Sequence, residues 1–272
     1  MVRLASDWIR RGFNRAALAY DETARLQQWV ESELVSRLDF LDLTPRRILD
    51  LGCGTGHAEP ALGRAYPGTV LVGIDSAFNF LRRKQEQEDR RSCVFCADAR
   101  ALPLASESID LVFSNLMLQW CENPGPVFGE VFRVLNGRSP FLFSTFGPRT
   151  LHEVKEAWAR VDREPHVLDF PGLPELGAQL SRHGFVEVVL DVETVIEEVA
   201  SLTELGRMLK HMGANSHPMG SHRGLTGRAR WQGVNEAYEA RRRPGGGLPV
   251  TYEIIYGMGW KPSLLRRVGD PS

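Results

Sequence analysis

An apolar strand that ends on three alternating glycines constrains this chain more than any other feature. The segment reads Ile48-Leu49-Asp50-Leu51-Gly52-Cys53-Gly54-Thr55-Gly56. Glycine is needed where the backbone takes a positive φ or must approach a ligand closely, and three glycines fall here within five residues. A strand that leads through such a turn into a helix is typical of proteins that bind a nucleotide cofactor.

The spacing of these glycines does not suit a dinucleotide. The dinucleotide fingerprint is Gly-x-Gly-x-x-Gly, in which the last glycine lets the following helix pack tightly. In this sequence that last place is taken by His57. The carboxylate of Asp50 would also repel a pyrophosphate and attract a cationic ligand. The turn therefore favours a phosphate-free cofactor such as S-adenosylmethionine, with a plain strand-to-helix turn as the alternative.

From Arg46 onwards, predicted strands and helices alternate along the chain. Strands are predicted at 47–51, 70–74, 93–97, 109–114 and 141–146, with helices after Gly56, around 77–88 and over 124–135. Strands separated by helices predict a parallel sheet with right-handed crossovers. Two later strands, near 186–192 and over 251–260, complete the predicted α/β fold. It is a seven-stranded, mostly parallel Rossmann-like sheet with helices on both faces.

The predicted domain organisation adds helical segments to this sheet. Residues 1–45 are expected to form a helical cap with a helix N-cap at Asp21. Residues 46–196 form the S-adenosylmethionine-binding core, and residues 250–272 form the last strand and a tail. The segment 197–249 is too long for an ordinary hairpin connection, so we interpret it as a helical insertion. We expect this insertion to form a lid over the acceptor.

Polar residues follow the predicted strands at the edge of the sheet where ligands bind. Asp75 comes 19 positions after Gly56 and could accept hydrogen bonds from both ribose hydroxyls, although Asp is also common at strand ends. Asp98 and the backbone N–H of Ala99 could bind an adenine. Asn115 begins a segment that could line the pocket or belong to the core. The predicted cofactor-binding residues are Asp50, Gly52, Gly54, Gly56, Asp75, Ser76, Asp98, Ala99 and Asn115.

The order of these motifs over residues 45–146 resembles class I S-adenosylmethionine-dependent methyltransferases. Residues 135–140 depart from the Pro-Gly-Gly turn that is usual there. Segments outside this core, at 13–20, 114–121, 151–166, 209–214 and 251–257, are similar to the BioC family of malonyl-acyl-carrier-protein O-methyltransferases. The resemblance covers nearly the whole chain. It implies methyl transfer to the free carboxylate of a malonyl thioester on acyl carrier protein, a step of biotin synthesis.

The resemblance also implies that Tyr20 closes over the cofactor near the reactive methyl group. A carboxylate with a pKa of about 4 is ionised at neutral pH, so this nucleophile needs no general base. The site has to supply hydrogen-bond donors or one cation to hold it. His152, Lys210 and His211 are the predicted donors, although each could instead be structural or solvated.

The charge balance limits the partners of the chain. It has 33 basic and 34 acidic residues, which provide no general attraction to nucleic acid or membrane. It lacks an apolar run of about 18 residues and a signal-peptide pattern, so we expect a cytoplasmic protein. An acidic carrier protein needs a basic surface. Residues 241–243 border the proposed lid and are favoured over the basic clusters at 10–11 and 82–84.

The four cysteines are too few and too scattered for a disulfide scaffold. Cys93 and Cys96 have C-x-x-C spacing, but a zinc site would need two more ligands, so we predict a buried strand and no metal. The oligomeric state is left open. Two other functions also stay open: a methyltransferase for another carboxylic acid or a quinone, and a non-catalytic assembly factor with the same fold.

Overall fold

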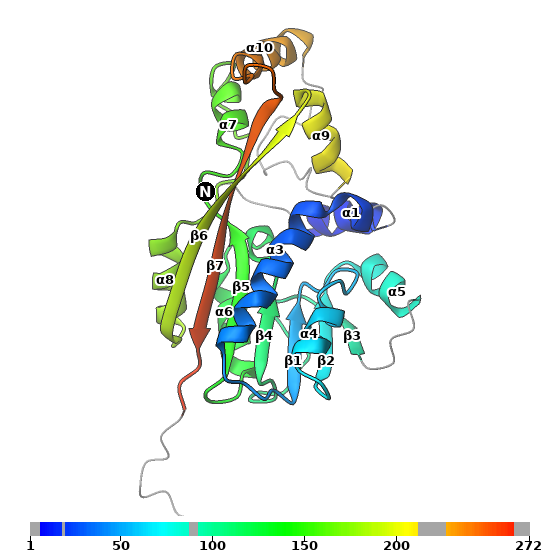
Figure 1. Ribbon diagram of the computed structural model, residues 1–272, viewed down its shortest axis with the longest axis vertical. Coiled ribbons are helices and arrows are strands. Elements are labelled where there is room, and N and C mark those ends of the chain that lie inside the picture. Colours follow the sequence, from blue (N-terminus) through cyan, green and yellow to red (C-terminus); the bar gives the residue numbers. More distant parts are fainter. Residues whose placement is uncertain (1–5, 18–19, 87–91, 212–226, 264–272) are drawn as a thin grey trace, which may run out of the picture.

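The computed structural model describes residues 6–17, 20–86, 92–211 and 227–263, and it contains a seven-stranded sheet with the order β3-β2-β1-β4-β5-β7-β6 (Figure 1). The strands are β1 (Arg47–Leu51), β2 (Val70–Asp75), β3 (Ser92–Cys96), β4 (Leu111–Ser114), β5 (Pro140–Phe146), β6 (Val186–Val199) and β7 (Leu248–Trp260). The strands from β1 to β5 pair in parallel, and β7 pairs antiparallel with β5 and β6. The predicted fold class is confirmed.

Helices cover both faces of the sheet. They are α1 (Ser6–Ala16), α2 (Tyr20–Thr23), α3 (Arg25–Ser36), α4 (Glu59–Ala65), α5 (Phe78–Glu86), α6 (Gly125–Val134), α7 (His152–Ala159), α8 (Leu173–Arg182), α9 (Leu202–His211) and α10 (Arg228–Glu239). Ile48 packs in one core layer with α3, and its neighbour Leu49 packs in the other with α6. Consecutive strand residues point to opposite faces of the sheet, and helices cover both faces, so both residues are fully buried.

The hairpin of β6 and β7 extends beyond the other strands and carries α7, α9 and α10 at its far end (Figure 1). β6 is longer than predicted, because its pairing with β7 continues as far as Val199 and Leu248. The insertion therefore begins after Val199. Its α10 is attached to β7 by the buried Tyr238, whose hydroxyl donates to the Pro249 carbonyl at 2.8 Å. Residues 212–226 of the insertion lie outside the described part.

The predicted N-cap at Asp21 is wrong. Asp21 lies inside α2, and α3 follows Ala24 with no side-chain capping bond. The Asp21 carboxylate instead accepts a 2.6 Å hydrogen bond from the Thr55 hydroxyl and lies 3.5 Å from Arg83. A tertiary interaction has replaced the local one, so Asp21 connects the N-terminal helices to the glycine turn and to α5.

The predicted burial of Cys93 and Cys96 is also wrong, because β3 is an edge strand of the sheet. Both thiols are exposed, and alternation along the strand places them on opposite faces. The described residues include no group of three or more His, Cys, Asp or Glu side chains placed to hold a metal ion. Within the same residues, no helix has the length and apolar character needed to cross a bilayer.

Candidate active site

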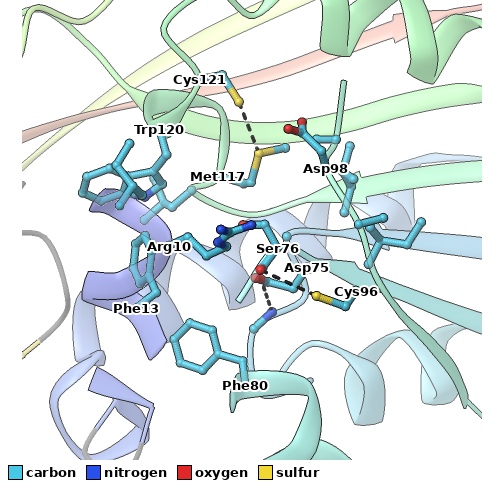
Figure 2. Close-up of a pocket in the computed structure, with 18 of the residues that line it drawn as sticks. Arg10, Phe13, Asp75, Ser76, Phe80, Cys96, Asp98, Met117, Trp120 and Cys121 are labelled. Atoms are coloured by element: carbon cyan, nitrogen blue, oxygen red, sulfur yellow. Dashed lines mark hydrogen bonds between the residues drawn. The ribbon is translucent and has the colours of Figure 1, made fainter. Parts of the chain in front are cut away.

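A cavity of about 440 Å³ lies at the carboxyl ends of β1 to β4, a volume within the usual range for a small-molecule site (Figure 2). Its wall includes Gly52, Gly54, Asp75, Ser76, Asp98, Ala99, Asn115, Met117 and Trp120 from the sheet edge, together with Ile9, Arg10, Phe13 and Tyr20 from the N-terminal helices. Seven of the nine residues predicted to bind the cofactor, all but Asp50 and Gly56, therefore surround one cavity.

The glycine turn forms the floor of this cavity and has the backbone conformation that its sequence predicts. Gly52, Gly54 and Gly56 have φ angles of 79°, 53° and 83°. A Cβ atom on Gly52 would lie 2.5 Å from Cγ of Met117, a side chain in the cavity wall. Gly56 lies outside the wall, and a Cβ there would be 2.8 Å from Cε of Lys84. The first glycine thus keeps the cavity open, whereas the third leaves room for a lysine beneath it.

Asp75 connects the cavity to the glycine turn. Its carboxylate accepts hydrogen bonds from the backbone N–H of Gly54 at 3.0 Å and of Ala77 at 2.7 Å. Burial raises the pKa of Asp75, and the hydrogen bonds from Ala77 and Gly54 oppose this rise. Each carboxylate oxygen has a second lone pair. Asp75 can therefore hold the turn in place and still accept hydrogen bonds from a ligand hydroxyl.

Asp98 lies across the cavity from Phe13 of α1 (Figure 2), and the neighbouring Arg100 binds its carboxylate. Arg100 donates from Nε to Oδ1 at 2.9 Å and from Nη2 to Oδ2 at 2.5 Å. These bonds lower the pKa of Asp98, so the carboxyl group is ionised at neutral pH. A ligand amino group would have to share this carboxylate with Arg100.

Asn115 positions the wall formed by the residues after β4. Its side-chain amide donates to the Gln27 carbonyl of α3 at 2.9 Å, and its oxygen accepts from the Ser144 hydroxyl of β5 at 2.7 Å. Leu116, the next residue, has a φ of 45°. The Asn115 amide therefore links the end of β4 to α3 and β5 by hydrogen bonds, next to the strained backbone of Leu116 in the cavity wall.

Four aromatic rings cover one side of the cavity. The ring centroids of Phe13 and Trp120 are 5.1 Å apart, and those of Tyr20 and Phe80 are 4.9 Å apart. Burial raises the pKa of Tyr20, and Asp75 raises it further, so the phenol stays protonated. Figure 2 shows Phe13, Phe80 and Trp120 opposite Asp98. Aromatic faces of this kind attract a cationic group and exclude water.

Phe13 and Tyr20 of this cover come from the N-terminal helices, Phe80 comes from α5 and Trp120 follows β4, and none of the rings comes from the described parts of the insertion. No residue of 197–211 or 227–249, the described parts of the insertion, contributes to the cavity wall. Sequence reasoning missed α1 as a wall element. The spacing of Ile9, Phe13 and Ala16 on one helix face was the signal that could have revealed it.

Two of the three predicted carboxylate donors, His152 and Lys210, lie outside the cavity wall. His152 begins α7, and its Nδ1 lies 3.1 Å from the Arg149 carbonyl. Lys210 is an exposed residue of α9. His211 ends α9, but its side chain lies outside the described part of the chain. Of the three residues predicted to act on the substrate whose side chains are described, Tyr20 lies in the cavity wall and His152 and Lys210 do not.

Asp50 lies behind the glycine turn, which corrects the expectation that it meets the ligand directly. Its side chain is 3 % exposed, and its Oδ2 has no hydrogen-bond partner among the residues described. Burial raises the pKa of Asp50 well above that of an ordinary carboxyl group, and Lys84 opposes this rise. Lys84 itself forms a buried ion pair with Glu59. The turn thus rests on a small buried charge cluster.

Comparison with known proteins relates this geometry to methyl transfer. Residues 49–143 match a family model described as a methyltransferase domain. A malonyl-acyl-carrier-protein O-methyltransferase of Methylovorus is 42 % identical, with 93 % of this chain and 88 % of the relative covered. One of Laribacter hongkongensis is 38 % identical, covering 95 % and 90 %. The YcgJ protein of Bacillus is similar in fold, with a TM-score of 0.59, 18 % identity, and 85 % and 98 % of the two chains covered.

Proposed function

The chain belongs to the family of malonyl-acyl-carrier-protein O-methyltransferases, and we propose that it methylates the free carboxylate of a malonyl thioester with S-adenosylmethionine as the methyl donor. The observation that carries this proposal is one cavity that joins a glycine turn, two strand-end carboxylates and an aromatic cover. Methylation would remove the negative charge of the malonyl group. The resemblance places such a product in biotin synthesis.

The residues of the cavity fit this cofactor. Asp75 would accept the ribose hydroxyls, and the open floor at Gly52 and Gly54 would admit the ligand to the backbone of the turn. Asp98 and Ala99 would bind the adenine. When bound, S-adenosylmethionine supplies an electrophilic methyl group on a sulfonium. The rings of Phe13, Tyr20 and Trp120 would attract that positive charge.

The chain's own residues would align and desolvate the acceptor. Its carboxylate is already ionised at neutral pH, so no residue has to remove a proton. The protonated hydroxyl of Tyr20 would donate a hydrogen bond to one carboxylate oxygen and leave the other free to attack. The apolar rings beside it would exclude water, which strengthens the interactions of the carboxylate and prevents hydrolysis. The rate would then depend on alignment.

Replacing Tyr20 by phenylalanine should lower kcat by roughly ten- to a hundredfold, because a hydrogen bond to a charged group contributes about 1.5–3 kcal/mol. The affinity for S-adenosylhomocysteine, measured by calorimetry, should stay within about twofold, since the ring is kept. Tyr66→Phe, outside the cavity wall, is the control. An equal loss of cofactor affinity and rate in Tyr20→Phe would contradict the assigned role.

Cofactor binding should protect one of two neighbouring thiols from alkylation. Cys93 and Cys96 are both exposed on β3, but of the two Cys96 alone lines the cavity. Saturating S-adenosylhomocysteine should slow the reaction of Cys96 with iodoacetamide severalfold, as read by mass spectrometry, and leave Cys93 unchanged. Burial raises the pKa of Cys121 to about 12, so it should stay unlabelled at neutral pH. Equal protection of Cys93 and Cys96 would contradict binding in this cavity.

The direct test is incubation with malonyl-acyl carrier protein and S-adenosylmethionine labelled in the methyl group. We expect a base-labile methyl ester on the malonyl group. Absence of transfer by folded protein that binds the cofactor would exclude this substrate and favour a methyltransferase for another acid or a quinone. Absence of cofactor binding would favour the non-catalytic assembly factor. Rescue of a strain that requires biotin because it lacks this activity would support the proposed role in the cell.

A further inference from the structure

The basic residues that the sequence favours for carrier docking are neutralised within the fold. Arg241 pairs with Glu156 of α7, Arg242 with Glu239 at 2.8 Å, and Arg243 with Glu198 at 3.1 Å. They follow α10, which lies at the far end of the β6–β7 arm (Figure 1). A surface that attracts an acidic protein needs uncompensated positive charge. Residues 241–243 do not provide it.

The outer face of α1 carries two arginines beside the cavity. Arg11 and Arg15 are four residues apart, so they lie on one helix face, and both are exposed. The opposite side of the helix carries Ile9 and Phe13, which line the cavity. Like charges at this spacing destabilise a helix. The helix dipole favours a cation in the last turn, where Arg15 lies. Arg11 lies further from the helix end, so the dipole does not account for a cation at this position.

A second pair of exposed cations lies on α9. Arg207 and Lys210 are three residues apart on one face of this helix, while Leu202 and Leu205 are buried beneath it. α9 contacts α2 and runs from the tip of β6 towards α1 (Figure 1). Among the side chains that the structure describes, no carboxylate forms an ion pair with Arg11, Arg207 or Lys210.

We propose that Arg11, Arg207 and Lys210 form a basic surface that docks the acidic carrier protein. This proposal rests on the function proposed above and names the surface that would serve it. A carrier presents its acyl group on a flexible arm, so its docking surface has to border the mouth of the cavity. α1 meets this condition, because its outer face carries the basic surface and its inner face forms the cavity wall.

The test compares two thioesters that differ in whether a protein carries them. The double variant Arg11→Glu, Arg207→Glu should raise KM for malonyl-acyl carrier protein by roughly tenfold at low salt, because it reverses two charges of the surface. High salt should shrink this difference, since exposed charges are screened. The kcat/KM for malonyl-pantetheine, which has no protein to dock, should stay within about twofold of the unaltered chain.

The matched control is Arg64→Glu. Arg64 is exposed in the last turn of α4, outside the cavity wall, and should leave both substrates unaffected. Equal losses with both thioesters would overturn the docking role, because they would place the defect in catalysis. An unchanged KM for the carrier would overturn it as well. If the unaltered chain methylates neither thioester, the proposed function itself fails, and this outcome is distinct from a failure of docking.

Discussion

Replacing Gly52 by alanine is expected to lower the affinity for S-adenosylhomocysteine by roughly a hundredfold or more. The φ of 79° costs an L-residue about 1–2 kcal/mol. The added Cβ would also lie 2.5 Å from Cγ of Met117 and drive that side chain into the cavity. The strain is the same with and without the ligand and lowers stability, whereas the obstruction opposes binding. Since each 1.4 kcal/mol is a factor of ten in affinity, an obstruction that costs about 3 kcal/mol gives the expected loss. Calorimetric titration measures the change.

Gly68→Ala separates backbone strain from obstruction of the cavity. Gly68 has a φ of 88°, but a Cβ there would have no atom within 4 Å, and the residue lies outside the cavity wall. Gly68→Ala should lose about 1–2 kcal/mol of stability in urea unfolding, which is the cost of the positive φ, and should keep its affinity for S-adenosylhomocysteine. If both alanine variants lost affinity equally, the close approach of Gly52 to Met117 would not be the cause.

Replacing Lys84 by methionine is expected to lower the free energy of unfolding by about 3–5 kcal/mol. Lys84 is 6 % exposed and pairs with Glu59, which is equally buried. Its side chain passes through space that Gly56 and Gly73 leave open, because a Cβ on Gly73 would lie 2.6 Å from Nζ. Without the ammonium group, Glu59 would remain as a buried charge with no partner beneath the glycine turn. Urea unfolding monitored by circular dichroism gives the change.

Two comparisons test whether burial causes this loss. Lys155→Met removes an ion pair with Asp169 whose side chains are 48 % and 57 % exposed, and it should cost less than about 1 kcal/mol. The double variant Glu59→Gln, Lys84→Met should be more stable than Lys84→Met alone, because it leaves no unpaired carboxylate at position 59. A loss below about 1 kcal/mol in Lys84→Met would contradict the supporting role of this ion pair.

The strands and the mostly parallel sheet were predictable, because each strand and its turn are local features and the helices between the strands indicate parallel crossovers. The glycines at 52, 54 and 56 predicted a left-handed backbone, and the structure confirms it. The length of β6 was not predictable, since it depends on pairing with a strand some fifty residues later in the chain. Cys93 and Cys96 were misjudged for the same reason: an apolar pattern does not show which strand will lie at an edge.

The candidate site was predictable in part. Strand-end residues such as Asp75 and Asp98 could be placed, because parallel strands bring their carboxyl ends to one edge. The sequence predicts a lid over the acceptor from the insertion, whereas the aromatic rings over the cavity come from α1, α2, α5 and the segment after β4, and no described residue of the insertion lines the cavity. The apolar face of α1 can be recognised in the sequence, but its position over the sheet edge beside β4 depends on long-range packing.

The sequence by itself therefore determined the sheet, the glycine turn and the edge at which a ligand binds, because backbone conformation and hydrophobic periodicity are encoded within short segments. The tertiary structure alone decided which charges are neutralised and which are exposed. Glu156 and Arg241 lie 85 positions apart and pair, as Glu59 and Lys84 do across 25, whereas Arg11 and Arg207 remain exposed. Such pairings depend on distances between side chains, and only folding sets those distances.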